Sequence, residues 1–195
     1  MPNICMVTVD SLSQNNVIYW DKSIYANADT FFIYRDTANY AFGLIGKIPA
    51  SANSRFIDTA RSIYSANGDP NITYWRYKIA YHDSCSNTMS PMSPWHQTIY
   101  QYNLGGLFLW NHYQIEGQTT PVPLLSNYIL KRKNDVNSNN WIVAATASAA
   151  SNNINDPQFA IFENVADWKI ETQWATMCSP DFDFTIVNKS SSNRK

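Results

Sequence analysis

The feature that most constrains the fold is an internal repeat with a period of about 90 to 98 residues, close to the length of one immunoglobulin-like sandwich. Val17-Ile18-Tyr19-Trp20 is echoed by Leu107-Phe108-Leu109-Trp110. Phe32-Ile33-Tyr34-Arg35 is echoed by Ile129-Leu130-Lys131-Arg132. The repeat predicts that the chain encodes the same structural unit twice.

Two further echoes follow in the same order. Asp58 corresponds to Asp156, and the segment from Trp75 to Cys85 corresponds to the segment from Trp168 to Cys178, with the same internal spacing. A strand-edge ion pair or a turn-capping aspartate is the expected role of Asp58 and Asp156, beside the strand-end Arg35 and Arg132.

The local pattern favours β-structure throughout. Short runs of β-branched and aromatic residues alternate with Asn, Ser, Asp, Gly and Pro, and helical periodicity is poor. We therefore expect an all-β fold of two tandem Ig-like, fibronectin type III β-sandwiches. Strands are expected near residues 4–11, 16–22, 30–36, 42–48, 54–58, 73–83, 97–103, 106–113, 127–134, 141–147, 158–162, 168–176 and 182–187.

The domain boundary is expected in Ser90-Pro91-Met92-Ser93-Pro94, because two prolines in five residues suit a short, stiff connector and not a central strand. This places the first sandwich at residues 1–94 and the second, with a C-terminal tail, at residues 95–195.

Charge argues against a nucleic-acid partner. Lys and Arg are scattered and the formal net charge is −1, whereas phosphate binding needs a basic face. The nearest basic run is Lys131-Arg132-Lys133, whose side chains alternate between the two faces of a strand. A solvated strand is favoured over a binding patch.

The cysteines and the apolar stretches indicate what to expect of disulfides, a signal peptide and membrane insertion. Cys5, Cys85 and Cys178 allow at most one disulfide and are expected to be buried small hydrophobic residues. No basic segment with an apolar core opens the chain, so we expect no signal peptide. No apolar run is long enough for a membrane span, so no membrane insertion is expected.

The motifs of enzymes and cofactor sites are missing from the sequence. We find no Gly-x-Ser-x-Gly elbow and no glycine-rich phosphate loop. His82 and Cys85 form one close pair, but zinc needs a second, which is not evident. The prediction is a non-enzymatic protein with no catalytic, cofactor-binding or metal-binding residues.

The aromatic residues divide into core and interface candidates. Core positions are predicted for four tryptophans, in preference to a carbohydrate-stacking role for the first two: Trp20, Trp110, Trp75 and Trp168. An interface is predicted on the aromatic segment that follows the connector, at Trp95, Ile99, Tyr100 and Tyr102. A seam between the domains is the equally weighted alternative.

Several segments resemble one known family: Ile4-Cys5-Met6-Val7-Thr8-Val9-Asp10, Asn16-Val17-Ile18-Tyr19-Trp20-Asp21-Lys22, Phe32-Ile33-Tyr34-Arg35, Arg76-Tyr77-Lys78-Ile79-Ala80 and His96-Gln97-Thr98. These are similar to the fibronectin-type-III-like modules of large surface and secreted proteins of the Bacteroidota, especially those exported by type IX secretion. The resemblance continues to Cys178 and Ser190-Ser191-Ser192-Asn193. It implies paired sandwiches that serve as spacers or adhesion modules without a catalytic site.

The chain departs from this family in showing no leader and no C-terminal sorting domain, and Trp75 stands where the family usually has Tyr. The first functional hypothesis is therefore a virion adaptor, at the head, neck or tail of a bacteriophage infecting Bacteroidota. The alternative is an adhesion or spacer module of an extracellular or cell-surface protein. Either reading predicts protein partners in a large homo- or hetero-oligomeric assembly, while a carbohydrate partner has no support in the sequence.

Overall fold

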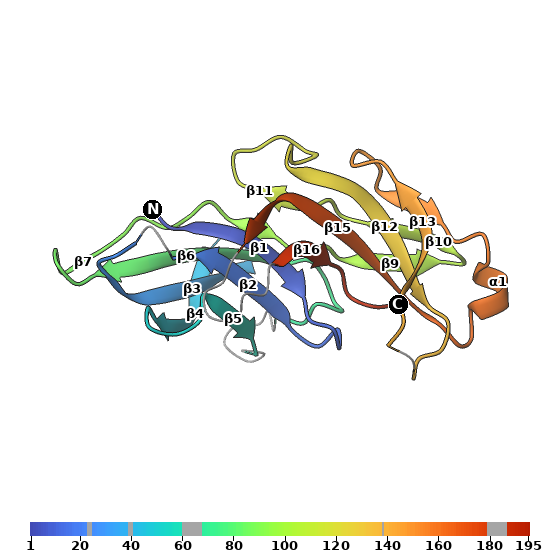
Figure 1. Ribbon diagram of the computed structural model, residues 1–195, viewed down its shortest axis with the longest axis horizontal. Coiled ribbons are helices and arrows are strands. Elements are labelled where there is room, and N and C mark those ends of the chain that lie inside the picture. Colours follow the sequence, from blue (N-terminus) through green and yellow to red (C-terminus); the bar gives the residue numbers. More distant parts are fainter. Residues whose placement is uncertain (23–24, 39–40, 60–67, 138, 179–186) are drawn as a thin grey trace.

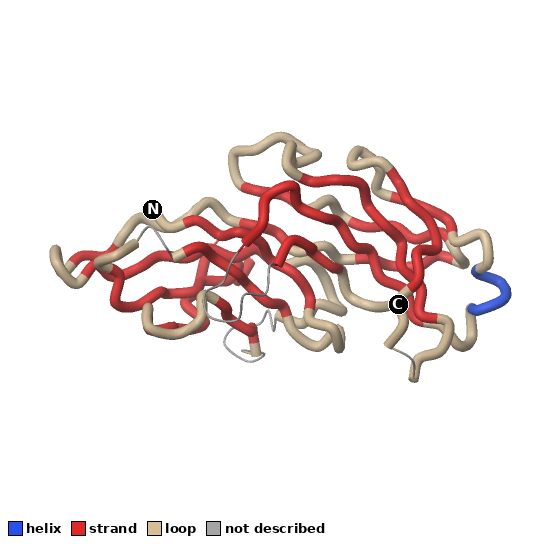
Figure 2. The backbone as a smooth tube through the Cα atoms, in the orientation of Figure 1, coloured by secondary structure: helices blue, strands red, loops and turns tan. Residues whose placement is uncertain are grey.

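The computed structural model describes residues 1–195 except 23–24, 39–40, 60–67, 138 and 179–186. The fold is all-β and of the immunoglobulin-like, fibronectin type III kind. Strands make up almost all of its regular structure, and the single described α-helix lies at one end of an elongated molecule (Figure 2). Two pairs of antiparallel sheets follow one another along the long axis (Figure 1).

The first pair of sheets contains most of the N-terminal half. A three-stranded sheet has the order β1-β2-β5, with β1 at Asn3–Val9, β2 at Asn16–Asp21 and β5 at Arg55–Asp58. The larger sheet has the order β11-β8-β6-β3-β4, with β7 also paired to β6. Its strands are β3 (Ala28–Ala38), β4 (Ala41–Pro49), β6 (Arg76–Asp83), β7 (Thr88–Met89), β8 (His96–Gln97) and β11 (Gln114–Ile115).

The second pair of sheets repeats this plan. A three-stranded sheet has the order β14-β10-β9, with β9 at Gln101–Leu104, β10 at Leu107–Trp110 and β14 at Asn153–Asn155. A four-stranded sheet has the order β13-β12-β15-β16. Its strands are β12 (Leu125–Lys133), β13 (Ile142–Ala147), β15 (Asp167–Cys178) and β16 (Val187–Ser191).

The first two sequence echoes occupy equivalent places in the two halves. Val17–Trp20 lies in β2, the central strand of its three-stranded sheet, and Leu107–Trp110 forms β10, the central strand of the other. Arg35 lies in β3 between β4 and β6, just as Arg132 lies in β12 between β13 and β15. The repeat thus reflects two strand arrangements of the same order.

The last echo is shifted by two residues. Strand pairing sets Arg35 opposite Tyr77, and it sets Arg132 opposite Trp168. Trp168 is therefore the structural counterpart of Tyr77, and not of Trp75 as the spacing predicts. Serine hydroxyls confirm this register, because the Ile79 N–H donates to Ser93 Oγ while the Ile170 N–H donates to Ser192 Oγ.

The predicted strand-edge ion pairs are in fact buried. Arg35 Nη1 lies 2.7 Å from Asp58 Oδ2, with both side chains fully inaccessible to solvent. Arg132 Nη1 lies 2.7 Å from Asp156 Oδ2, with the side chains 3% and 1% exposed. Odd and even residues of a strand face opposite sides, and these arginines fall on the inner side, which corrects the expectation of exposed pairs.

All four predicted core tryptophans are buried. Trp20 and Trp168 are almost fully enclosed, and Trp110 and Trp75 are 3% and 8% exposed. Trp20 packs against Phe31, and Trp110 against Tyr128 on the facing sheet. The buried apolar residues of both halves form one continuous cluster.

Some predicted strands are corrected. The segment 158–162 contains α1 (Phe159–Phe162) instead of a strand, because Pro157 restricts the backbone and Asp156 Oδ1 accepts the Gln158 N–H. The strand of this region is β14, which ends three residues before the segment predicted to be a strand. The predicted strand 97–103 is divided into β8 and β9. The last predicted strand, 182–187, lies outside the described residues except at its end.

The proline-rich segment is packed rather than free. The Ser93 N–H donates to the Ile79 carbonyl oxygen, and the Ser90 N–H donates to the Tyr81 carbonyl oxygen. Beyond it, β8 still pairs with β6. The larger sheet thus extends past the predicted division at 94/95, which stays a prediction as a domain boundary.

Candidate functional site at the junction of the sandwiches

A strand from the second half completes the sheet of the first. β11 follows β10 in the chain, yet it pairs with β8, with Gln114 opposite Gln97 and Ile115 opposite His96. Because β8 in turn pairs with β6, backbone hydrogen bonds join a strand from the C-terminal half of the chain to the larger sheet of the N-terminal half. The sequence gives no sign of this pairing, since a strand of two residues carries no recognisable period.

Polar side chains reinforce this connection. The Glu116 carboxylate lies 2.7 Å from Lys78 Nζ on β6, and its Oε2 also accepts the Trp95 N–H. The Glu116 N–H donates to the Trp95 carbonyl oxygen. The C-terminal segment returns to the first sandwich as well, where the Ser191 N–H donates to Thr8 Oγ1. These contacts fix the relative orientation of the two sandwiches.

A hydrogen-bonded chain crosses the junction. The Val7 N–H donates to the Tyr113 hydroxyl, which lies 2.7 Å from His96 Nδ1. The Tyr113 N–H donates in turn to the Tyr128 hydroxyl. We infer that Tyr113 donates its own proton to Nδ1, so that the ring proton of His96 is on Nε2. Burial lowers the pKa of His96 to about 3, so the imidazole is neutral at physiological pH.

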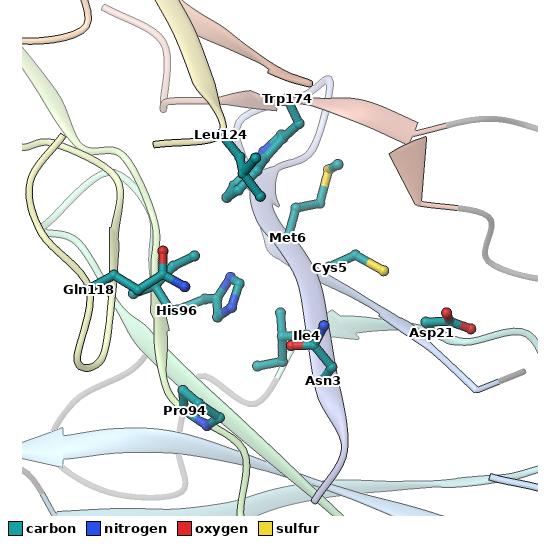
Figure 3. A pocket seen from close by; sticks show the side chains of 11 residues that line it. Asn3, Ile4, Cys5, Met6, Asp21, Pro94, His96, Gln118, Leu124 and Trp174 are labelled. Carbon is teal, nitrogen blue, oxygen red and sulfur yellow. The ribbon is translucent and has the colours of Figure 1, made fainter. Parts of the chain in front are cut away.

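An open cavity of about 330 Å³ lies beside this chain. Figure 3 shows the His96 ring extending from β8 toward Ile4 on β1, with Met6, Trp174 and Leu124 around the same hollow. The His96 and Trp174 rings stack with centroids 6.4 Å apart. The walls therefore come from both sandwiches, a common location for binding pockets.

A second hollow of about 210 Å³ adjoins the first, and Leu124 and Trp174 line both. Leu124 is 47% exposed, so an apolar side chain stands at the shared rim. The remaining residues of the second hollow are Pro123, Leu125, Ser126, Gln173 and Ala175. Together the two hollows, here called the junction groove, form an apolar-rimmed depression along the junction.

The sequence-predicted interface residues are only partly brought together here. Ile99 is 1% exposed and belongs to the core, which corrects its place on an exposed face. Trp95 is half-buried, with the Arg76 guanidinium 4.8 Å from its ring centroid. Tyr100 and Tyr102 stack with centroids 6.4 Å apart, and Tyr102 is 41% exposed. None of these four lines the junction groove, and an interface role for them stays a prediction.

The residues that do line it are not singled out by the sequence. His96, Trp174 and Leu124 lie far apart along the chain and belong to no motif that indicates a binding site.

The cysteines differ from expectation. Cys5, which lines the cavity, is disulfide-bonded, and Cys85 is free and exposed. Neither is therefore the buried, unbonded residue that the sequence suggests. The side chain of Cys178 lies outside the described residues.

Other kinds of site have little to support them. Within the described part of the chain, no group of three or more His, Cys, Asp or Glu side chains is placed to hold a metal ion. His82, the candidate zinc ligand, instead has Nδ1 2.9 Å from Asp29 Oδ2. Among the same residues, no helix has the length and apolar character needed to cross a bilayer.

Comparison with known proteins adds little. No family model matches the chain, and no curated protein matches its sequence. Among solved structures, the selenomethionine-substituted chicken interferon gamma receptor alpha chain is similar over 100% of this chain and 95% of that chain, with 11% identity and a TM-score of 0.33. A TM-score this low carries no functional argument, and the strand order and register described above support the fold.

Proposed function

We propose that the chain is a non-enzymatic interaction module whose two sandwiches act as one rigid body and bind a partner protein along the junction groove. The observation that carries this proposal is the groove itself. Residues of both sandwiches line its first hollow, and the exposed apolar side chain of Leu124 lines both hollows. Protein interfaces concentrate their binding energy in apolar side chains that fill such pockets.

The chemistry of the groove supports binding more than catalysis. His96, the imidazole in the cavity, has its Nδ1 engaged by Tyr113, and burial holds its pKa at about 3. A general base works best with a pKa near the working pH, so this imidazole is poorly suited to accept a proton. Its Nε2–H is instead suited to donate a hydrogen bond to an acceptor on a partner.

Two biological settings fit such a module. One is an adhesion or spacer module of an extracellular or cell-surface protein, and the other is a virion adaptor subunit of a phage of Bacteroidota. Cys5 is disulfide-bonded, and disulfides persist mainly outside the reducing cytosol, at cell surfaces and virion surfaces alike. The disulfide is therefore compatible with both settings.

The groove is tested by placing a photo-crosslinking amino acid at Leu124, with Ile161 as the matched control. Ile161 is also an exposed apolar residue, but it lies on α1 at the far end of the second sandwich (Figure 1). In the producing cells we expect one defined adduct from position 124 that position 161 does not give. The Leu124→Asp variant should abolish the native complex while Ile161→Asp leaves it intact.

The same material separates the settings. A complex recovered from purified particles supports the virion adaptor, and one recovered from the cell surface or medium supports the surface module. A chain that remains monomeric in all native fractions, with equal background from both crosslinking positions, contradicts the proposal.

A further inference from the structure

The outer face of the four-stranded sheet of the second sandwich gathers positive charge. Lys131 and Lys133 lie on the outer side of β12, whereas Arg132 between them points inward to Asp156. Lys133 is itself covered, at 3% exposed, and its Nζ donates to the Val136 carbonyl oxygen. Lys169 on β15, Lys189 on β16 and Arg194 lie on the same side. We call this set of five the cationic face: Lys131, Lys133, Lys169, Lys189 and Arg194.

These cations outnumber their counterions. Glu171 Oε1 lies 3.2 Å from Lys131 Nζ and 3.8 Å from Lys189 Nζ, and its Oε2 lies 3.4 Å from Lys169 Nζ. Asp167 is shared between Lys133 at 3.1 Å and Arg194 at 3.5 Å. Among the described residues, ion pairs thus join five cations to two carboxylates, on a chain whose formal net charge is −1.

The ring of Trp141 lies next to three of these cations. The Trp141 ring centroid is 5.6 Å from Lys133 Nζ, 4.9 Å from Lys169 Nζ and 5.4 Å from Arg194 Cζ. Burial lowers the pKa of Lys169, Glu171 opposes that change, and the neighbouring Lys131 and Arg194 add to it. Like charges held this close repel one another, and an anion bound across them would relieve the repulsion.

The corresponding face of the first sandwich has a smaller excess of positive charge. Arg76 lies 3.6 Å from Asp36, and Lys78 has Glu116. Lys47 Nζ lies 5.0 Å from the centroid of the Phe32 ring. The larger excess is therefore a property of the second sandwich and not of the fold.

We propose that the cationic face binds an acidic polysaccharide, a sugar polymer that carries sulfate or carboxylate groups. Lys189 is 51% exposed, and Lys131, Lys169 and Arg194 are partly exposed beside it. Their strands are about 4.8 Å apart, so these four cations can meet successive anionic groups of a linear chain that crosses the strands. Ser191 Oγ, 3.5 Å from Lys169 Nζ, and the exposed Gln173 add hydrogen-bonding groups for sugar hydroxyls.

Two other polyanions fit the face less well. Single-stranded nucleic acid is bound by stacking its bases on open aromatic rings, whereas three cations cover Trp141. Interfaces between proteins are depleted in lysine, and four of the five cations here are lysines.

The test measures binding of the whole chain to dextran sulfate over a range of salt concentrations. Lys131→Gln with Lys189→Gln removes two charges from the face, and Lys47→Gln with Arg55→Gln removes two exposed charges elsewhere as the matched control. We expect the slope of log affinity against log salt to fall by about two in the first double variant and to stay unchanged in the second. Lys189→Gln alone, at a half-exposed position, should lower it by about one.

Other polymers distinguish the source of the anion. If polygalacturonate binds as tightly as dextran sulfate, carboxylate groups are sufficient for binding. If it binds more weakly, the face prefers sulfate groups. Unmodified dextran, which carries no charge, should not bind. Equal losses in both double variants, no binding of dextran sulfate by the wild type, or tighter binding of poly(dT) or poly-glutamate at equal charge would each overturn the proposal.

Discussion

The two sandwiches bury the same ion pair but enclose it differently. In the first, Arg35 donates to Asp58, and the Tyr77 hydroxyl donates to the same carboxylate. Gly68 lies against both charged side chains. In the second, the Trp168 Nε1–H donates to Asp156, and the Phe162 ring lies 4.0 Å from the Arg132 guanidinium carbon. A repeated strand core therefore tolerates unrelated loops over the same buried charges.

Arg132 of the second pair also has hydrogen-bond acceptors beyond the carboxylate. Its Nε donates to Asn134 Oδ1, and its Nη2 donates to Gln158 Oε1. Partners beyond the carboxylate reduce the cost of burying a guanidinium. The second pair should thus not depend on Asp156 alone.

The largest expected effect comes from removing that aspartate. Asp58→Ala leaves the buried Arg35 without its carboxylate, so we expect a loss of about 3–5 kcal/mol in the free energy of unfolding. In Asp156→Ala, Asn134 and Gln158 still accept from Arg132, so we expect a loss below about 3 kcal/mol. Urea unfolding followed by tryptophan fluorescence measures both variants. Asp58→Asn, which keeps an acceptor, serves as the control, and a loss of about 3–5 kcal/mol for Asp156→Ala would contradict this expectation.

The tryptophans test whether the two sandwiches unfold together. Trp20→Ala and Trp110→Ala should each cost about 3–5 kcal/mol. Because the buried apolar residues form one cluster, either change should lower the temperature of a single calorimetric transition. Trp20→Phe is the milder control, since Trp20 Nε1 has no hydrogen-bond partner among the described residues. Two transitions, with only one shifted, would show independent units.

Two histidines give opposite pH dependence. Burial lowers the pKa of His96 from 6.5 to about 3. Between these two pH values the unfolded chain binds a proton at His96 and the folded chain does not. Stability should fall by up to about 1.4 kcal/mol per pH unit as the pH drops from 6.5 toward 3. The hydrogen bond to Asp29 raises the pKa of His82, so its contribution is present below pH 6.5 and is lost as the pH rises through the raised value.

Urea unfolding at several pH values separates these contributions. His96→Phe should flatten the acid limb, while His82→Gln should leave that limb in place and remove a small contribution near pH 6. An acid limb that is unchanged in His96→Phe would show that other groups cause it.

A single added methyl group tests the cover of the first ion pair. Gly68 has φ of 69°, and an added Cβ would meet Arg35 Nη1 and lie 2.6 Å from Asp58 Oδ2. Gly68→Ala should cost more than the roughly 1–2 kcal/mol expected for a left-handed backbone alone. Gly117→Ala, at φ of 76° with nothing within 4 Å of the added Cβ, isolates that backbone cost. Equal losses in thermal unfolding would mean that the pair accommodates the methyl group.

The sequence predicted the fold best where the residue pattern repeats with the two-residue period of a strand. The tetrapeptides ending in Trp20 and Trp110 are strands with the same place in each sandwich, because alternation and burial are both local. Spacing misled at Trp75, since strand register, and not residue count, sets Tyr77 beside Arg35. The signal for α1 was present in Asp156-Pro157 but weaker than the apolar run after it.

The candidate sites were less predictable because they depend on distant pairing. β11 has only two residues, and its partner β8 lies on the other side of β9 and β10 in the chain. The cationic face includes Lys131 and Lys133, whose alternation was predicted, but Lys169 and Lys189 join them only through the register of three strands. No local pattern contains that information.

The strand that the second sandwich adds to the first has a mechanical consequence. For the halves to separate under tension, the backbone hydrogen bonds of either the β8–β11 or the β6–β8 ladder must break, and the buried apolar cluster that both halves share must open. A pulling force is therefore expected to extend the chain in one large step, in which both halves give way, and not in two steps of one sandwich each.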